Sequence, residues 1–159
     1  MVAEVGVGRT THRAVAARAG VPLGATTYYY PTLSDLIAAG LELAAQQVDA
    51  EVAALASQVR TADDVPGALS RMAAESVTDR PRALLEYELY LAAARTPSLR
   101  PLARQWIDGL HAVVAPHTGP AAATAIIALV DGAVLQSVVT GDEVAVEPLA
   151  SAISTLMPS

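Results

Sequence analysis

The sequence has no cysteine, no lysine and no phenylalanine, and only 16% of its 159 residues are charged. The lack of cysteine excludes disulfides, thiolate zinc sites, iron–sulfur clusters and cysteine nucleophiles. Hydrophobic residues make up 53%, which excludes a disordered protein because disordered segments have the opposite balance. A chain of this length forms one domain, or one domain plus a small module.

Targeting and membrane segments are not visible in the sequence. The first four residues, MVAE, supply neither a basic region nor an apolar run, so no secretory signal is indicated. The most apolar stretch, residues 121–139, is interrupted by polar residues such as Asp131 and Gln136. This composition favours a buried helix over a membrane span. We therefore expect a soluble cytoplasmic protein without a membrane partner.

Charge is divided unevenly along the chain. Residues 5–34 contain three arginines and no acid, whereas residues 35–159 contain 15 acids and seven arginines. The formal net charge is −6. A short basic head on an acidic body is typical of a protein in which one module alone meets phosphate groups.

The pattern of apolar residues predicts an all-α fold. No segment reads as a strand, and the spacing predicts helices over residues 33–59, 65–77, 81–95, 98–115, 120–139 and 148–157. Thr32 and Asp35 have capping-box spacing at the start of the longest helix. Its apolar stripe consists of Ile37, Leu41, Ala44, Val48, Val52, Leu55 and Val59.

The last two predicted helices suggest self-association. Apolar residues surround the helix over 120–139, and a helix without a polar face needs cover on both sides. Ala125, Ala128 and Gly132 are small enough to let a second helix approach closely. Because two-fold homo-oligomers are common, we expect a homodimer. Its predicted interface consists of Ile126, Val130, Ala133, Leu149 and Ile153; the alternative is that earlier helices cover residues 120–139 completely.

The segment Arg9–Leu36 has the pattern of two short crossing helices. Thr10 or Thr11 can cap a first helix, and Ala16 and Gly20 allow the close crossing and the tight turn. The apolar contacts within the pair are expected from Val15, Ala19 and Val21.

The second helix of the pair, residues 22–30, has no charge and short leading side chains, which suits a helix lying deep in a major groove. Thr27 is expected to reach base edges, and Leu23 and Ala25 to pack on thymine methyl groups. The hydroxyls of Tyr28 and Tyr29 can donate to phosphate oxygens.

This segment resembles the helix-turn-helix of the TetR family of transcriptional repressors. The matching residues are Thr11, Arg13, Val15, Ala16, Ala19, Gly20, Val21, Gly24, Tyr29, Asp35 and Leu36. By this resemblance the DNA contacts fall on Thr11, Arg13, Leu23, Gly24, Ala25, Thr27, Tyr28 and Tyr29. Leu33 stands where many members carry a phosphate-binding lysine. The family also has a full helix ahead of the motif; residues 1–8 are too few for it, so we expect that the true start is missing.

The resemblance implies a DNA-binding helix-turn-helix over residues 1–32 and a helical effector-binding and dimerisation bundle over residues 33–159. It implies palindromic operator DNA, a second copy of the chain and a small-molecule effector as partners, and no cofactor. The effector pocket is expected around Leu55, Met72, Tyr87, Glu88 and Trp106. Glu88 falls beside Tyr87 on an apolar face, where it either recognises a cation or hydroxyl of a ligand or pairs with Arg104.

An enzyme is disfavoured because no spacing brings together a nucleophile and base, paired carboxylates or metal ligands. His111 and His117 do not share a helical face, and Glu86 and Glu88 point to different sides of a helix. A remaining alternative is a dimeric ligand-binding or scaffold protein with an incomplete, non-functional DNA-binding head.

Overall fold

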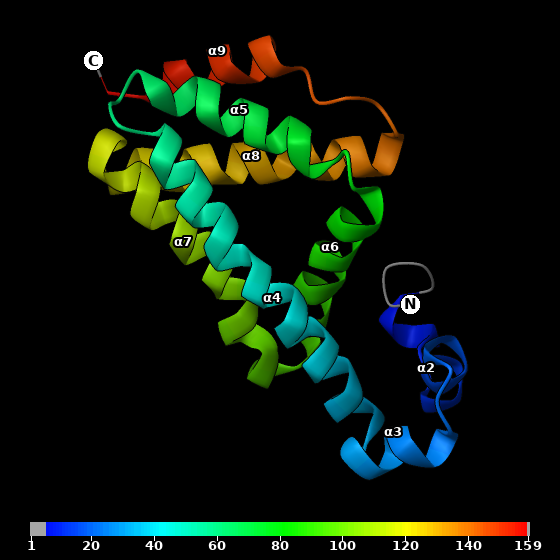
Figure 1. Cartoon of the computed structure of the whole chain (residues 1–159). Helices are drawn as coiled ribbons and strands as arrows, with labels where there is room; N and C mark the ends of the chain where they lie inside the picture. The colour runs from blue at the N-terminus through cyan, green and yellow to red at the C-terminus, as the bar shows by residue number, and fades with distance from the viewer. Residues whose placement is uncertain (1–5, 159) are drawn as a thin grey trace.

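The computed structural model describes residues 6–158, except the side chains of Val7 and residues 44–47, and those residues form helices and no strand (Figure 1). The helices of the head are η1 (Val7–Arg9), α2 (His12–Ala19) and α3 (Leu23–Tyr29). Those of the body are α4 (Leu33–Gln58), α5 (Asp64–Ser76), α6 (Arg80–Arg95), η2 (Pro97–Leu99), α7 (Arg100–Thr118), α8 (Pro120–Thr140) and α9 (Val146–Leu156). The predicted all-α class is confirmed.

Local sequence signals fix several helix ends. The amide of Asp35 donates to the hydroxyl of Thr32 at 3.1 Å, and the amide of Thr32 donates to the Asp35 carboxylate at 3.0 Å, so the predicted capping box begins α4. The side chain of Asp79 caps α6 through the amide of Arg82 at 3.2 Å. These bonds satisfy amides that lack a partner in the first helical turn.

The end of α7 differs from the prediction. The helix was expected to stop at residue 115, but it continues through Pro116 to Thr118. A proline so close to the end removes one helical hydrogen bond without changing the direction of a long following segment. Gly119, with φ of 80°, then turns the chain into α8.

The body has two parts that meet along α4 and α7 (Figure 1). Helices α5, α8 and α9 lie together at one end and enclose the main core, while α4 and α7 pack side by side and lead away from it. The head formed by α2 and α3 lies at the opposite end, beyond the N-terminus of α4. Because α4 connects the head directly to the body, a shift of α4 would move the head.

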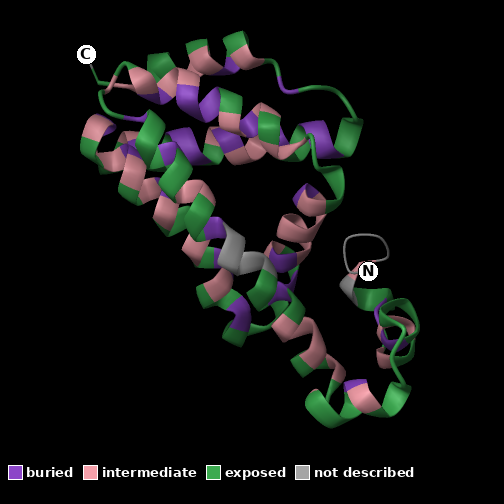
Figure 2. Cartoon of the chain, in the orientation of Figure 1, coloured by how far each residue is buried: buried purple, intermediate pink, exposed green. Residues whose placement is uncertain are grey.

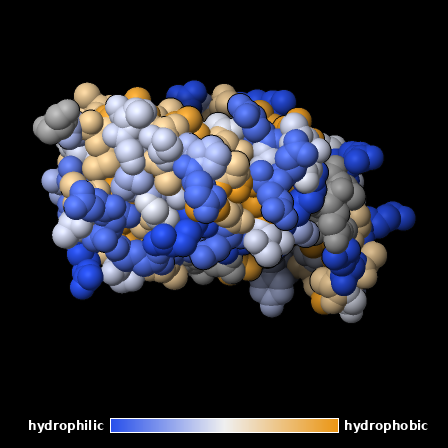
Figure 3. Space-filling view, turned by 90° about the horizontal axis from the view of Figure 1, so that it is seen from above, coloured by the Kyte–Doolittle hydropathy of each residue, from blue (hydrophilic) through white to orange (hydrophobic). Residues whose placement is uncertain are grey.

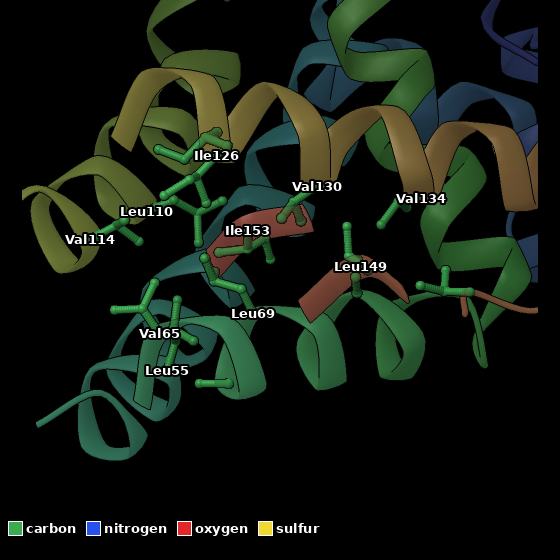
Figure 4. Close-up of a cluster of buried hydrophobic side chains, with 14 of the residues drawn as sticks. Leu55, Val65, Leu69, Leu110, Val114, Ile126, Val130, Val134, Leu149 and Ile153 are labelled. Carbon is green, nitrogen blue, oxygen red and sulfur yellow. The ribbon is translucent and has the colours of Figure 1, made fainter. Parts of the chain in front are cut away.

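The main core explains why the predicted dimer residues must be corrected. Ile126 and Ile153 are fully buried within the single chain, and Val130 and Leu149 are 2% and 6% exposed. Figure 4 shows these side chains converging with those of α5 and α7. They are therefore unavailable to a second subunit. Ala133 is only half-buried and lies at the edge of this core.

A smaller cluster joins α4 to α6 and α7 nearer the head. It contains Leu41, Leu89, Ala92, Ala93, Leu99 and Ala103. Leu41, Val48, Leu55 and Val59 confirm the predicted stripe of α4 by their burial, whereas Ala44 lies outside the described side chains. Buried residues are concentrated in the body and are few in the head (Figure 2).

The outward face of α8 is mostly apolar, with Thr124 and Gln136 among its exposed polar residues; its apolar side chains are small in the first half of the helix and larger in the second. Ala125, Ala128, Leu135 and Val139 are exposed on it, and Gly132 is half-exposed. By length and composition, α8 is the one described helix apolar enough to cross a membrane, and a third of its most apolar stretch is buried. Seen from above, the end layer mixes apolar and hydrophilic residues (Figure 3). The core helix of a water-soluble protein passes the same test of length and composition.

Candidate DNA-binding head and ligand cavity

The head has the geometry of a helix-turn-helix. Thr11 caps α2 by accepting a hydrogen bond from the amide of Ala14 at 3.1 Å. Gly20 ends α2 with φ of 66°, and the amide of Val21 reaches back to the carbonyl of Ala16 at 3.0 Å. Only glycine adopts this left-handed conformation without strain, so the turn depends on Gly20.

The residues predicted to contact DNA lie on the surface of this head. Seven of the eight are exposed, and Ala25 is half-buried. Tyr28 and Tyr29 are 79% and 74% exposed, and their rings meet edge to face with centroids 5.2 Å apart. The helix α3 therefore presents an uncharged, largely apolar and hydroxyl-bearing surface to solvent.

The inner contacts of the head differ from those predicted. Ala16 and Thr26 are buried, and the hydroxyl of Thr26 donates to the carbonyl of Leu23 at 2.9 Å. Ala19 and Val21, expected inside the pair, are exposed instead. Their helical spacing is compatible with either placement, because a pair of short helices buries only a narrow strip of each.

A cavity of about 190 Å³ lies in the body between α4, α5, α6, α7 and α8. Four of the five predicted effector residues line it: Leu55, Met72, Tyr87 and Trp106. Each comes from a different helix, so the tertiary packing brings together residues up to 51 positions apart in the sequence. The family resemblance implied a pocket among these segments, and the role of these residues in binding stays a prediction.

Glu88 lies away from this cavity. Its carboxylate approaches Gly6, at the start of the head, and it lines a separate cavity with Asp35 and Arg95. Glu86 and Tyr87 line the main cavity, whereas the packing of α6 directs the next side chain, that of Glu88, toward the head. The expectation that Glu88 belongs with Tyr87 and Trp106 is therefore corrected.

The acidic groups of the cavity were missed from the sequence. Asp131 lies on α8 and Glu86 on α6, one turn from Arg82. Burial raises the pKa of Asp131 to about 6, and a hydrogen bond from the Trp106 side chain partly offsets this rise. Burial also raises the pKa of Glu86, against the opposing effect of Arg82. The detectable signal was that Asp131 is the one charged residue between Pro120 and Thr140.

Arg82 binds two of the acids that line the cavity. Its guanidinium forms ion pairs with Glu51 on α4 and, at 3.6 Å, with Glu86 one turn along α6. Within the described part of the chain, no arginine or histidine forms an ion pair with Asp131. The cavity therefore has more negative than positive charge.

Tyr87 and Tyr90 form an aromatic wall on α6. Their rings meet edge to face with centroids 6.0 Å apart, and burial raises the pKa of both phenols well above the usual range. Both hydroxyls therefore remain protonated donors. The hydroxyl of Tyr87 donates to the main-chain carbonyl of Asp131 at 3.1 Å.

A second, more apolar cavity of about 190 Å³ adjoins the first. It is lined by Leu43, Leu85, Leu89 and Leu102, among others. Arg82, Glu86, Tyr90 and Trp106 line both cavities. Together the two form a site with an acidic aromatic part and an aliphatic part. Residues 6–158 contain no group of three His, Cys, Asp or Glu side chains that could hold a metal ion.

Comparison with known proteins identifies the family. Residues 60–159 match the family described as "Tetracyclin repressor-like, C-terminal domain". The solved structure of SCO1917, a member of the TetR family from Streptomyces coelicolor A3, is 41% identical with a TM-score of 0.82 and covers 94% of this chain and 87% of that one. No curated protein sequence matches the chain. The chain belongs to the TetR family of transcriptional regulators.

Two further structures resemble the chain. The multidrug binding protein EbrR in complex with ethidium is 40% identical with a TM-score of 0.82, and the match covers 99% of this chain and 92% of that one. EbrR has also been solved with imidazole, proflavin and malachite green. SCO7518 from Streptomyces coelicolor A3(2) is 26% identical with a TM-score of 0.83, over 99% of this chain and 92% of that one.

Proposed function

We propose that this chain represses transcription as a cytoplasmic homodimer that binds palindromic operator DNA and releases it when a small molecule binds. In this proposal residues 1–32 bind DNA and residues 33–159 bind the effector and the second subunit. The observation that carries it is the exposed, uncharged face of α3 within a helix-turn-helix of a TetR-family chain.

The DNA contacts follow from the exposed side chains of the head. The proposed contact residues are Thr11, Arg13, Leu23, Gly24, Ala25, Thr27, Tyr28 and Tyr29. The short side chains of α3 let its backbone lie close to base edges, and the exposed tyrosine hydroxyls are free to donate to phosphate oxygens. A dimer would hold its two recognition helices roughly 34–36 Å apart, one helical turn of DNA.

The proposed dimer forms through the outward face of α8, together with α9. Ala125, Ala128 and Gly132 provide a shallow apolar surface onto which the same surface of a second chain can pack. This face replaces the buried residues that the sequence pattern suggested. It also accounts for an apolar helix surface that the chain itself leaves uncovered.

The effector is proposed to bind in the double cavity of the body. EbrR, solved with planar dyes, supports an aromatic organic molecule as the ligand. Both cavities contact α4, which leads to the head. A ligand that favours another position of α4 would lower DNA affinity by the difference in its affinity for the two states.

Fluorescence anisotropy with the DNA that flanks the gene tests the proposal. We expect binding whose logarithm falls steeply and linearly with that of the salt concentration. Arg13→Gln should weaken binding and reduce the salt slope by about one, as expected for one lost phosphate contact. The matched control is Arg100→Gln, on the exposed surface of the body, which should leave the slope unchanged. No binding at low salt by a protein that still binds dyes would instead favour the ligand-binding or scaffold alternative.

A further inference from the structure

Asp131 is an acidic residue in an otherwise uncharged helix. It is the one charged residue of α8, and it lines the cavity together with Tyr87, Tyr90 and Trp106. A carboxylate in such surroundings loses hydration, which is unfavourable unless a partner compensates. The charges of the residues around Asp131 therefore decide whether its carboxylate has a compensating partner.

The other charged groups of the cavity leave Asp131 without a cation. Glu51 on α4, Glu75 on α5 and Glu86 on α6 are acidic, and Arg82 on α6 is the one basic residue among those that line this cavity. Arg82 is engaged by Glu51 and Glu86. From α7 the cavity receives Trp106 and no charged group.

Tyr87 and Trp106 are the neighbours that interact with Asp131. The hydroxyl of Tyr87 donates to the main-chain carbonyl of Asp131 at 3.1 Å, and the Trp106 side chain lowers the pKa of the carboxyl, against the larger effect of burial. The carboxylate lines the cavity together with three aromatic side chains. A carboxylate next to aromatic faces matches a planar cation, which gains an ion pair and ring contacts at once.

We propose that Asp131 selects the charge of the effector, by pairing with the cationic nitrogen of a planar aromatic ligand that packs against Tyr87, Tyr90 and Trp106. This inference rests on the proposed effector cavity and adds to it the residue that discriminates a cation from a neutral molecule. Apolar substituents of the ligand extend past Tyr90 and Trp106 into the aliphatic cavity, which shares these two residues.

Protons compete with the ligand for Asp131. Because burial raises the pKa of this carboxyl to about 6, a growing fraction is neutral below that pH and unable to pair with a cation. Glu86, whose pKa is also raised, changes in the same direction, while the two tyrosines stay neutral throughout. Affinity for a permanent cation should therefore fall as the pH drops through about 6, and Asp131→Asn should lose most of this dependence.

The experiment compares a charged with an uncharged ligand in the full chain without DNA. Proflavin is the cationic probe; acridine has the same rings without the amino groups and is uncharged at pH 8. Titration calorimetry at pH 8 should show that Asp131→Asn weakens proflavin binding at least about tenfold and changes acridine binding less than about twofold. Asp131→Glu should retain the preference for proflavin. Asp108→Asn makes the same change at an exposed position of α7 that does not line the cavity, and it should change proflavin binding less than about twofold.

The pH profile supplies a second measurement. Ethidium, a permanent cation, should bind the wild type progressively more weakly from pH 8 to pH 5. Asp131→Asn should show only the smaller decrease that Glu86 contributes. Unchanged proflavin affinity in Asp131→Asn would overturn the inference, as would loss of proflavin and acridine together, which would make Asp131 a structural residue. If the wild type binds neither ligand, the proposed effector cavity fails as well. If the chain does not bind DNA but its proflavin binding depends on Asp131, the inference is supported and the proposed DNA-binding function fails.

Discussion

Gly109 on α7 lies directly against Val52 on α4: a Cβ atom at Gly109 would come within 2.7 Å of one Val52 methyl group and 3.4 Å of the other. This close approach lies within the most extensive packing that α4 makes with another helix of the body. A branched side chain has little freedom to move aside. The packing of α4 on α7 therefore depends on the absence of a side chain at position 109.

The first prediction concerns this contact. Gly109→Ala should lower the free energy of unfolding by about 1 kcal/mol, because overpacking by about 1–3 kcal/mol exceeds the gain of about 1 kcal/mol in helix propensity. In a Val52→Ala background the same change should be stabilising. Urea unfolding of the two single variants and the double variant measures the difference in sign. The same sign in both backgrounds would show that the two residues do not compete for space.

The second prediction concerns two glycines of the head. Gly20→Ala should destabilise the head by about 1–2 kcal/mol, because its φ of 66° is unfavourable for alanine although no atom lies within 4 Å of the added Cβ. Hydrogen exchange of the α2 and α3 amides should become faster while the melting temperature of the body stays unchanged, since few residues link the two.

Gly24→Ala is the matched variant. A Cβ atom at Gly24 would also have no other atom within 4 Å, but Gly24 lies inside a helix. It should stabilise α3 by about 0.5–1 kcal/mol. Because the proposed docking brings this backbone close to base edges, the same variant should bind operator DNA more weakly. Anisotropy titration measures this, and an increase in affinity would contradict close approach at position 24.

The third prediction concerns the outward face of α8. Ala128→Glu should convert a dimer to a monomer of 16.3 kDa in light-scattering measurements, because the added charge would be buried in the proposed interface. Thr78→Glu adds the same charge at an exposed turn and should leave the dimer intact. A dimer that persists in Ala128→Glu would place the interface elsewhere.

The fourth prediction concerns stability and pH. The pKa of Asp131 rises from 3.8 to about 6 on folding, so the folded chain binds this proton more tightly than the unfolded chain. The resulting stabilisation is complete below about pH 3.8 and is lost as the pH rises through about 6. Asp131→Asn should therefore be more stable than the wild type at pH 8, by about 1–2 kcal/mol after allowing for solvent screening.

Thermal unfolding without ligand checks the sign of this effect. The melting temperature of Asp131→Asn should exceed that of the wild type at pH 8 by several degrees, about 2–4 °C for each kcal/mol, and the gap should close by pH 4. A gap that widens toward low pH would contradict the direction of the pKa shift. Together with weaker cation binding, higher stability would show that the wild type retains an unfavourable charge for the sake of its ligand.

Local signals in the sequence were sufficient for most of the fold. Thr32 and Asp35 specify the start of α4 by their own hydrogen bonds, and Gly20 specifies the turn of the head, because these interactions involve only neighbouring residues. Helical periodicity also placed Leu55, Met72, Tyr87 and Trp106 on inward faces. These four side chains line one cavity because the inward faces of neighbouring helices surround the same space.

The helices, the head and the family were thus predictable from the residues alone, because their signals depend on short-range geometry. The inward side of α8 depended on the packing of the whole chain, because a helix with apolar residues all round has no pattern to orient it: Ile126 and Val130 lie in the core, and Ala128 faces outward. The same packing placed Asp131, and not Glu88, among the aromatic rings. On α6 itself the side chains of Glu86 and Glu88 point about 200° apart, so one acid lies in the cavity and the other outside it.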